Sequence, residues 1–272
     1  MRSKNGRTTK DGIRIYEQAD FAGMHAAGAL AAQILDDIAA HVFVGQTTGE
    51  IDRLITAMVE EAGATSATIG YKGYQHASCI SINHVVCHGI PGDKKLKDGD
   101  ILNIDVTVIV DGWFGDTSRM YVAGKLPRKA ERLIQITHDA LMKGIEVVKP
   151  GNTFGDIGHA IQSYAEGQRV SVVRDFCGHG LGQVFHAPPN VLHYGRPGTG
   201  PTLEEGMFFT IEPMLNLGRP ETKVLADDWT AVTRDKSLSA QFEHSVGVTA
   251  DGVEIFTLSP GGLFHPTYNT ES

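Results

Sequence analysis

Two parts of this sequence resemble each other closely enough to predict a fold of two similar halves. The stretch GQTTGEIDRLI matches the later stretch GNTFGDIGHAI, and DGDILNID, which ends at Asp105, matches EEGMFFTIE, which ends at Glu212. CHGIP around His88 resembles FHAPP around His186. One such pair can arise by chance, but three pairs in the same order indicate a repeated unit. We therefore expect Asp105 to correspond to Glu212 and one imidazole to the other.

Hydrophobic periodicity places similar elements in the same order in both halves. The two matching glycine-led stretches each contain a Thr followed three residues later by an acidic residue, which is typical of a helix start. The predicted fold class is α+β, with two pseudo-symmetric halves. The expected helices lie near Asp20 to His41, Thr47 to Glu61, Arg128 to Val148 and Thr153 to Gln168, and the expected strands near Ile101 to Val110, Trp113 to Val122, Met207 to Met214 and Phe242 to Thr249.

The stretch NIDVTVIVDGWFGDTSR contains a strong hairpin signal. Asp111-Gly112 between two β-rich runs favours a two-residue turn. Such a turn sets Thr107 opposite Asp116, and Asp105 lies two residues from Thr107 on the same face. Asp105 and Asp116 then form a diagonal cross-strand pair about 7–8 Å apart at the backbone, so both side chains can reach one object.

This pair of carboxylates has two explanations. Both can be solvent-facing residues of an edge strand, where charge is common. If another part of the protein covers them, a cation must lie between them, because burying two unpaired carboxylates is very costly.

Composition is that of an ordinary globular protein. The 272 residues are 41% hydrophobic and 21% charged, which is enough for a sizeable core. The net charge of −8 argues against a general nucleic-acid or anionic-membrane binder, so we expect neither DNA nor a membrane as partner. The three cysteines, Cys79, Cys87 and Cys177, form no CxxC pair, and no apolar run approaches about 20 residues. These features favour a cytoplasmic protein.

Acidic residues and histidines recur in the strand-like and glycine-rich segments of both halves. Four carboxylates and one imidazole make an oxygen-rich set, which suits two divalent ions bridged by shared carboxylates better than a structural cysteine-based zinc site. Two such ions can activate a water and polarise a carbonyl, as in metal-assisted hydrolysis. Each residue also has an ordinary explanation alone, such as Glu212 as a sheet-edge acid or His179 as a turn residue. The candidate ligands are Asp105, Asp116, His179, Glu212 and Glu243.

Five motifs, in this order, resemble those of the type I methionine aminopeptidases. They are CHGIPGD, NIDVTVIVDGWFGDTSRMY, CGHGLGQVFHAPPNV, GMFFTIEPM and SAQFEHSVGVT. The resemblance extends from about Ile13 to Phe256. It implies the pita-bread fold, in which two pseudo-symmetric α+β halves surround a dinuclear metal site. It also implies hydrolytic removal of the N-terminal (initiator) methionine from nascent proteins when the second residue is small and uncharged.

The resemblance implies two divalent ions per subunit, which can be Co²⁺, Mn²⁺, Fe²⁺ or Zn²⁺, and assigns a role to each candidate ligand. Asp105 would hold one ion, and Asp116 and Glu243 would bridge the two. His179 and Glu212 would complete the other site. Glu212 would also act as general base and acid for the bridging water.

The resemblance implies further roles around the metals. His186 resembles the histidine that hydrogen-bonds the developing oxyanion, and His88 the one near the scissile nitrogen. Asn83 and Ser239 match positions that bind a monovalent cation, Na⁺ or K⁺. One departure is Thr68, where many bacterial members carry cysteine, and it bears on inhibitor preference rather than on the reaction. The substrate-binding residues are expected to be these two histidines and a soft, aromatic methionine pocket formed by Tyr71, Tyr74, Cys79, Phe185 and Trp229.

The resemblance also bears on organisation and partners. We expect a flexible N-terminal tail over residues 1–12, a single catalytic metallopeptidase domain over residues 13–260 and a C-terminal tail over residues 261–272. The expected partners of this monomer are nascent polypeptide N-termini. A ribosome contact is a further expectation, because the segment 217–237 carries four basic residues, although Asp227 and Asp228 offset part of that charge.

Two other functions fit parts of the pattern. An X-Pro dipeptidase or aminopeptidase shares the fold and the ligand types, but such enzymes usually carry an additional N-terminal domain, for which we expect no room here. A pita-bread binding protein without catalysis is the second, but it should have lost ligands that this sequence retains.

Overall fold

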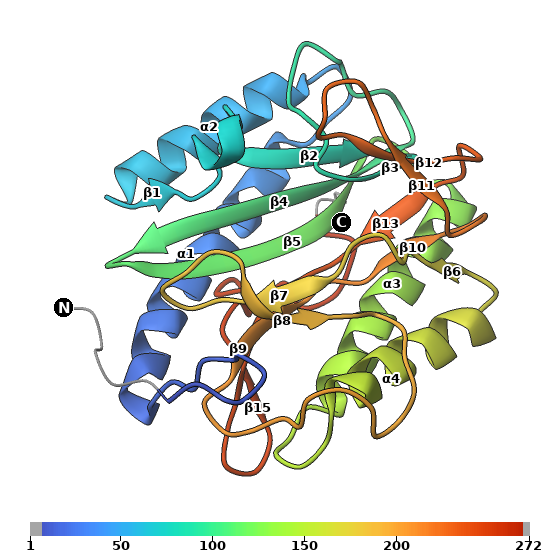
Figure 1. Cartoon of the computed structure of the whole chain (residues 1–272). Helices are drawn as coiled ribbons and strands as arrows, with labels where there is room; N and C mark the ends of the chain where they lie inside the picture. The colour runs from blue at the N-terminus through green and yellow to red at the C-terminus, as the bar shows by residue number, and fades with distance from the viewer. Residues whose placement is uncertain (1–6, 269–272) are drawn as a thin grey trace.

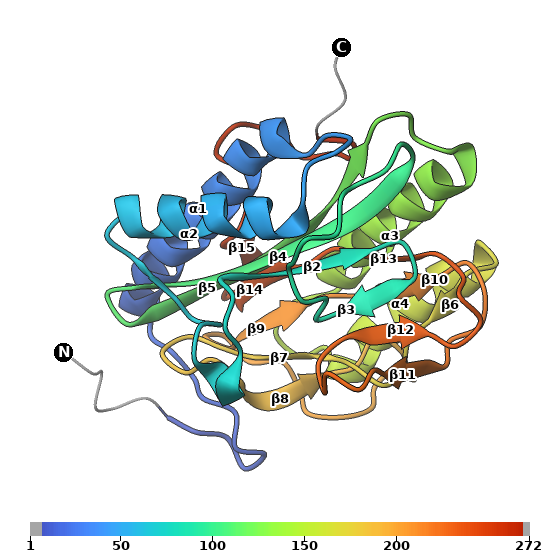
Figure 2. The ribbon, with the colours of Figure 1, turned by 90° about the horizontal axis from the view of Figure 1, so that it is seen from above.

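The structure is a computed structural model, and it describes residues 7–268. Its two helix pairs lie beside different sheets (Figures 1 and 2): the first pair lies beside the long β4–β5 hairpin, and the second lies beside shorter strands of the second half of the chain. The fold class is therefore α+β, as predicted. The helices are α1 (Phe21–Ile38), α2 (Thr48–Glu61), α3 (Arg128–Glu146) and α4 (Phe154–Gly167).

The repeated helix starts form the same local structure in both halves. Thr47 precedes α2, and its hydroxyl accepts a hydrogen bond from the backbone N–H of Glu50, whose carboxylate accepts from the backbone N–H of Thr47. Thr153 and Asp156 make the equivalent capping box before α4. These reciprocal bonds satisfy backbone donors that have no partner inside the helix. The predicted repeat of helix starts is confirmed.

The helices are slightly shorter than the sequence predicts. The first expected helix consists of α1 flanked by two short 3₁₀ turns, Gln18–Asp20 and Ala39–His41. The third expected helix was predicted to end at Val148, but α3 ends two residues earlier, at Glu146. Helix ends are set by capping and packing rather than by apolar periodicity, so differences of one or two residues are ordinary.

The strands form four small sheets that meet around the middle of the molecule. One contains β1, β2, β4 and β5, a second β6, β10 and β13, a third β3, β11 and β12, and a fourth runs in the order β15-β14-β9-β7-β8. The bounds are β1 (Thr65–Ser66), β2 (Ser78–Ile82), β3 (Val85–Cys87), β4 (Asp100–Val110), β5 (Trp113–Ala123), β6 (Ser171–Val172), β7 (Gly178–Gly180), β8 (Ala187–Val191), β9 (Phe208–Ile211), β10 (Met214–Asn216), β11 (Thr222–Val224), β12 (Ala231–Thr233), β13 (Ser239–Gln241), β14 (His244–Val248) and β15 (Val253–Ile255).

The β4–β5 hairpin has the predicted register. Thr107 pairs with Asp116, and Val110 pairs with Trp113 across the Asp111-Gly112 turn. Both turn residues have positive φ, 49° at Asp111 and 84° at Gly112, as a two-residue hairpin turn of this kind requires.

The two faces of this hairpin pack against different halves of the protein. Leu102, Ile104 and Val106 belong to a hydrophobic cluster with α1 and α2. Ile101 belongs to the other large cluster, which contains the apolar faces of α3 and α4. Asp105 lies on the same face as Ile101, because side chains alternate along a strand. The hairpin therefore separates the two hydrophobic cores, and the side chains of Asp105 and Asp116 face the second half of the chain.

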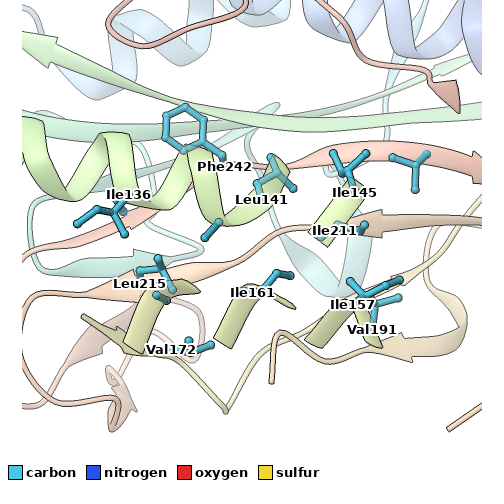
Figure 3. Packing of buried hydrophobic residues seen from close by; sticks show 14 of the residues in the cluster. Ile136, Leu141, Ile145, Ile157, Ile161, Val172, Val191, Ile211, Leu215 and Phe242 are labelled. Carbon is cyan, nitrogen blue, oxygen red and sulfur yellow. The ribbon is translucent and has the colours of Figure 1, made fainter. Parts of the chain in front are cut away.

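The second core closes the other side of the site. Figure 3 shows Leu141 and Ile145 of α3 and Ile157 and Ile161 of α4 packed against apolar side chains of the neighbouring strands. The strand residues labelled there are Val172, Val191, Ile211 and Leu215, and Phe242 lies between β13 and β14. Within residues 7–268, no helix is long and apolar enough to cross a membrane.

Two expected strands are interrupted at acidic residues. The expected strand from Met207 to Met214 is split into β9 and β10, which belong to different sheets, with Glu212 and Pro213 between them. Proline has no backbone N–H to donate to a sheet ladder. The expected strand from Phe242 begins later, because β14 starts at His244. The prediction of one continuous strand from Met207 to Met214 was wrong, whereas the last expected strand is present as β14 with a later start, and both differences occur beside candidate ligands.

The two chain ends pack against the domain in the described region. The expected flexible tail included Arg7 to Gly12, but these residues form a turn in which the backbone N–H of Ile15 bonds to the carbonyl of Arg7. The Arg7 side chain pairs with Glu204. Near the other end, Tyr268 packs against Tyr121 and Phe242. The described parts of both proposed tails thus contact the rest of the protein, although residues 7–12 are largely exposed. The tail boundaries stay a prediction, and residues 1–6 and 269–272 lie outside the described residues.

Gly115 of β5 is required by a close contact with α1. A Cβ at this position would lie 2.2 Å from the carbonyl oxygen of Ala27 and 2.7 Å from the nitrogen of Gly28. We expect Gly115→Ala to lower the free energy of unfolding by about 1–3 kcal/mol, the usual cost of overpacking, as measured by urea denaturation. Gly167→Ala is the control, because no atom lies within 4 Å of its added Cβ. An equal, small effect of both changes would contradict the tight contact.

Candidate metal centre

A cavity of about 800 Å³ lies between the two halves and contains all five candidate ligands. Asp105 and Asp116 enter it from the β4–β5 hairpin. His179 enters from β7, and Glu212 and Glu243 enter from the strand breaks before β10 and β14. The structure therefore brings together side chains that are far apart in the sequence.

The hairpin fixes Asp116 through its cross-strand partner. Thr107 donates a hydrogen bond of 2.7 Å from its hydroxyl to Oδ1 of Asp116. The hydroxyl of Ser245 donates a 2.6 Å bond to the backbone carbonyl of Asp116. One oxygen of the carboxylate is thus oriented by the hairpin, and the other, Oδ2, lies 3.5 Å from Nε2 of His179.

His179 and Glu212 are positioned by a shared threonine. The hydroxyl of Thr210 accepts a hydrogen bond from the backbone N–H of His179 and donates one of 2.7 Å to Oε1 of Glu212. The same Oε1 lies 3.7 Å from Nε2 of His179. Gln241 Nε2 is 3.3 Å from the other oxygen, Oε2. The Glu212 side chain is therefore held at both oxygens.

Glu243 is anchored to the first half of the chain by backbone contacts. Its N–H bonds to the carbonyl of Ser118, and its carbonyl accepts from the hydroxyl of Thr117, at 3.1 and 2.7 Å. The residue is only 3% exposed. This bridge between β5 and the start of β14 sets Glu243 beside Asp116.

The carboxylates of the cluster strongly perturb one another. Burial, together with the charges of Asp116 and Glu212, raises the pKa of Asp105 well above its usual value, and burial and the same neighbours raise the pKa of Glu243. Burial also raises the pKa of Glu212 to about 7. Burial acts to lower the pKa of His179, but its hydrogen bond to Asp116 and the charge of Glu212 outweigh it and raise the pKa to about 9. The cluster has excess negative charge and needs cations.

The geometry and chemistry of these residues fit divalent metal ions. Asp116, His179 and Glu243 each offer one ligand atom, and these atoms all lie within 4.8 Å of one another. Asp105 and Glu212 line the same cavity and complete a set of four carboxylates and one imidazole. Carboxylate oxygens and imidazole nitrogens are ordinary ligands for first-row divalent metals, and bound dications would offset the mutual repulsion of the carboxylates.

The two expected catalytic histidines both line the cavity and have different ring neighbours. The ring of His186 lies 4.2 Å, centre to centre, from that of His179. Burial and the neighbouring His179 lower the pKa of His186 to about 4, and burial lowers the pKa of His88. His88 contacts the rings of Phe176 and Trp229. Both imidazoles are therefore neutral at pH 7.

The expected methionine-pocket residues all line the cavity, in two groups. Tyr74 and Trp229 pack together with ring centres 4.8 Å apart, and Cys79 lines the same cavity. Tyr71 and Phe185 pack together at 5.0 Å beside His186. These apolar, aromatic and thiol groups surround a space suited to an unbranched thioether side chain.

The structure also brings together the two residues expected to bind a monovalent cation. The backbone N–H of Ser239 bonds to the carbonyl of Asn83 at 2.8 Å. Asn83 has a φ of 55° and holds Asp100 through its side-chain amide. Thr68, the departure from the family pattern, donates a 2.7 Å hydrogen bond to the carbonyl of His76 at the cavity wall.

Sequence reasoning missed several residues of the site. His193 is fully buried, and its Nε2 accepts a 3.1 Å bond from the backbone N–H of Glu212. Gln241 contacts the Glu212 carboxylate, and Phe176 and Met214 line the cavity. The position of Gln241 two residues before Glu243 in the motif was the one available signal. His193 had none, because it follows no local pattern.

Known proteins resemble this chain along most of its length. A sequence model of metallopeptidase family M24 matches residues 22–250. A methionine aminopeptidase of Rickettsia prowazekii (strain Madrid E) is 60% identical over 257 residues, which cover 94% of this chain and 99% of the relative. A methionine aminopeptidase of Escherichia coli (strain K12) is 51% identical over 248 residues, covering 90% of this chain and 94% of the relative.

Solved structures give the same relationship. The crystal structure of methionine aminopeptidase from Rickettsia prowazekii matches with a TM-score of 0.90 at 60% identity, covering 90% of this chain and 100% of that one. Prolidase from Pyrococcus furiosus matches with a TM-score of 0.74 at 20% identity, covering 90% of this chain and 65% of that one, a likeness of fold alone. The chain therefore belongs to metallopeptidase family M24 and has its pita-bread fold.

Proposed function

We propose that this protein is a methionine aminopeptidase, which hydrolyses the peptide bond after an N-terminal methionine when the second residue is small and uncharged. The observation that carries the proposal is the match to the Rickettsia methionine aminopeptidase over 94% of this chain and 99% of that relative at 60% identity. The cavity supports it, because carboxylates and an imidazole lie beside an aromatic and thiol wall in one space.

The proposed metal ligands are the five residues of the cluster. Asp105 would hold one divalent ion, Asp116 and Glu243 would be shared between two, and His179 and Glu212 would complete the second. When bound, two divalent ions at this site supply a polarised carbonyl and a water of lowered pKa. Carboxylate and imidazole ligands admit Co²⁺, Mn²⁺, Fe²⁺ and Zn²⁺ alike, so availability selects among them.

Glu212 is the proposed general base and acid. Its Oε1 and Oε2 are held by Thr210 and Gln241, so the carboxylate is fixed where it can accept a proton from the attacking water and return it to the leaving amine. His186 is neutral, and its N–H can donate to the oxyanion that develops at the scissile carbonyl. His88, which also lines the cavity, is proposed to contact the scissile nitrogen.

The finer properties of the enzyme are also proposals. Nascent polypeptide N-termini are the substrates, the cytoplasm is the compartment, and the protein acts as a monomer. The basic side chains of segment 217–237, which includes β11 and β12, support docking on the ribosome. Asn83 and Ser239, brought together by a backbone hydrogen bond, are proposed to bind Na⁺ or K⁺ through backbone oxygens.

A substrate panel tests the function. The purified protein, loaded with each candidate metal in turn, should release methionine from Met-Ala-Ser and leave Ala-Pro and Gly-Pro peptides intact. Cleavage of the proline peptides instead would identify an X-Pro peptidase, and binding of Met-Ala-Ser without turnover under every metal would identify a binding protein.

Removal of divalent metal should abolish turnover and lower thermal stability. Ligand present at about 100 times its dissociation constant stabilises a folded protein by about 2.7 kcal/mol. For a chain of this size that corresponds to a rise in Tm of about 5–10 °C. We expect Mn²⁺ or Co²⁺ to produce this shift in chelator-treated protein, measured by scanning calorimetry. Asp116→Asn should remove most of it, and an undiminished shift in that variant would contradict the bridging role.

A further inference from the structure

Lys72 stands out among the described residues that line the site cavity, because it is the one lysine or arginine among them. It lies in the short 3₁₀ turn Tyr71–Gly73 with a φ of 46°. Gly70 and Gly73 on either side also have positive φ. A lysine rarely adopts this conformation, so the backbone of this turn is unusual at the residue that carries the cation.

A row of rings connects Lys72 to the metal centre. The ring centre of His186 lies 4.2 Å from that of His179, and the ring centre of Tyr71 lies 5.1 Å from that of His186. The ammonium nitrogen of Lys72 lies 5.3 Å from the centre of the Tyr71 ring. Each step corresponds to between about one and about one and a half residues of extended chain, at about 3.3–3.6 Å per residue.

The path of a bound substrate follows from the proposed function. The methionine side chain occupies the buried end of its pocket, at Tyr74 and Cys79, whereas Tyr71 is half-buried and lies beside the exposed Lys72. The scissile bond lies at the carboxylate cluster. The remaining chain must leave toward the exposed part of the cavity, where Lys72 lies. After the second residue, the third or fourth residue is therefore within reach of the Lys72 ammonium group.

We propose that Lys72 is a specificity-determining residue that favours an acidic side chain at the third or fourth position of the substrate. The inference rests on the proposed function. Within residues 7–268, no carboxylate forms a salt bridge with Lys72, so its charge is available to the substrate. Its ammonium group lies over the face of Tyr71, and a cation on an aromatic face remains able to attract an anion.

Two acidic residues that line the cavity, Asp175 and Asp11, also bear on the proposed preference for acidic substrates. Asp175 accepts hydrogen bonds from the hydroxyl and backbone N–H of Thr222, so its carboxylate already has hydrogen-bond partners within the protein. Asp11 lines the cavity within the N-terminal turn, whose Gly12 lies near Pro188. Asp11 is exposed and should disfavour acidic substrates, so its removal should act in the opposite direction to removal of Lys72.

The test compares C-terminally amidated peptides Met-Ala-Asp-Ser, Met-Ala-Ser-Ser and Met-Ala-Lys-Ser, with a second set that carries the variable residue at position four. In wild-type enzyme we expect kcat/KM to be about 3- to 10-fold higher for the Asp peptide than for the Lys peptide. The Asp side chain would be attracted to Lys72 and the Lys side chain repelled by it, and each such exposed interaction is weak. The difference should lie mainly in KM, because the contact is equal in ground and transition states. The ratio of kcat/KM between the Asp and Lys peptides should fall toward one at 0.5 M salt, because salt screens exposed charges.

Variants assign the effect to its source. Lys72→Met keeps the aliphatic stem over Tyr71 and should bring the Asp-to-Lys ratio of kcat/KM near one. Lys72→Glu should invert this ratio, and Lys72→Arg should retain it. Lys129→Glu, an exposed residue of α3 with the same charge change, should leave it unchanged, and Asp11→Asn should increase it. A wild-type ratio near one, or a ratio that survives Lys72→Met, overturns the inference. Failure to cleave Met-Ala-Ser-Ser at all is a different result and overturns the proposed function itself.

Discussion

Glu212→Gln is expected to lower kcat by about 10²–10⁴-fold, the usual contribution of general acid–base catalysis, while Met-Ala-Ser still binds. The amide keeps the size of the side chain and its acceptor for the Thr210 hydroxyl, but it has no carboxylate to take a proton from water. Steady-state kinetics would give kcat, and competition between Met-Ala-Ser and a chromogenic substrate would give the affinity.

Two measurements separate this role from simple loss of metal. Elemental analysis should show that the Glu212→Gln protein retains most of its divalent metal. Glu205→Gln, an exposed neighbour in the same segment, should keep wild-type activity. A Glu212→Gln enzyme with more than about a tenth of the wild-type kcat would show that another group moves the proton.

His186→Ala is expected to lower kcat and kcat/KM together by about 10²–10³-fold, the range found when one oxyanion donor is removed. The neutral imidazole lies beside His179, with ring centres 4.2 Å apart, and donates to charge that is present mainly in the transition state. Stopped assays of methionine release across substrate concentrations would measure both parameters.

The metal content of the His186→Ala protein decides between two roles. A transition-state donor can be removed with both ions retained, whereas a ligand cannot. His159→Ala, an exposed histidine on α4, is the control for loss of an imidazole far from the cavity. A fall in bound metal in the His186 variant alone would make His186 a ligand and its assignment as donor wrong.

The parts of the site that the sequence predicted are those governed by local rules. Asp111-Gly112 determines the hairpin turn, and the turn determines that Thr107 faces Asp116. Once this register is set, alternation along a strand puts Asp105 on the same face. The helix starts at Thr47 and Thr153 were predictable for the same reason, because a capping box needs only four consecutive residues.

The parts that could not be predicted depend on contacts between distant segments. The hydroxyl of Thr117 bonds to the carbonyl of Glu243, and the hydroxyl of Ser245 bonds to that of Asp116. Such bonds have no periodic pattern and follow only from the docking of the two halves. His193 beneath Glu212 belongs to the same class. The breaks at Glu212 and before His244 were missed because apolar runs predict continuous strands.

The methionine pocket came from the family resemblance rather than from physical rules. Tyr71, Tyr74 and Trp229 lie in segments without regular patterns, and nothing in their spacing predicts that they share one space. The hydrogen-bonded turn that begins at Arg7 was also missed, since a basic segment at a chain end usually indicates a solvated tail.

The bridge between Ser118 and Glu243 has a consequence for a newly made chain. Asp105 and Asp116 come from the first half, and His179, Glu212 and Glu243 come from the second. Metal uptake and folding are coupled when neither part holds a complete ligand set. A chain in which only the first half has formed therefore has no working protease. The proposed ligand set is complete only when the last strands have joined the first, so metal uptake and activity are expected only in a chain whose two halves have both been made and docked.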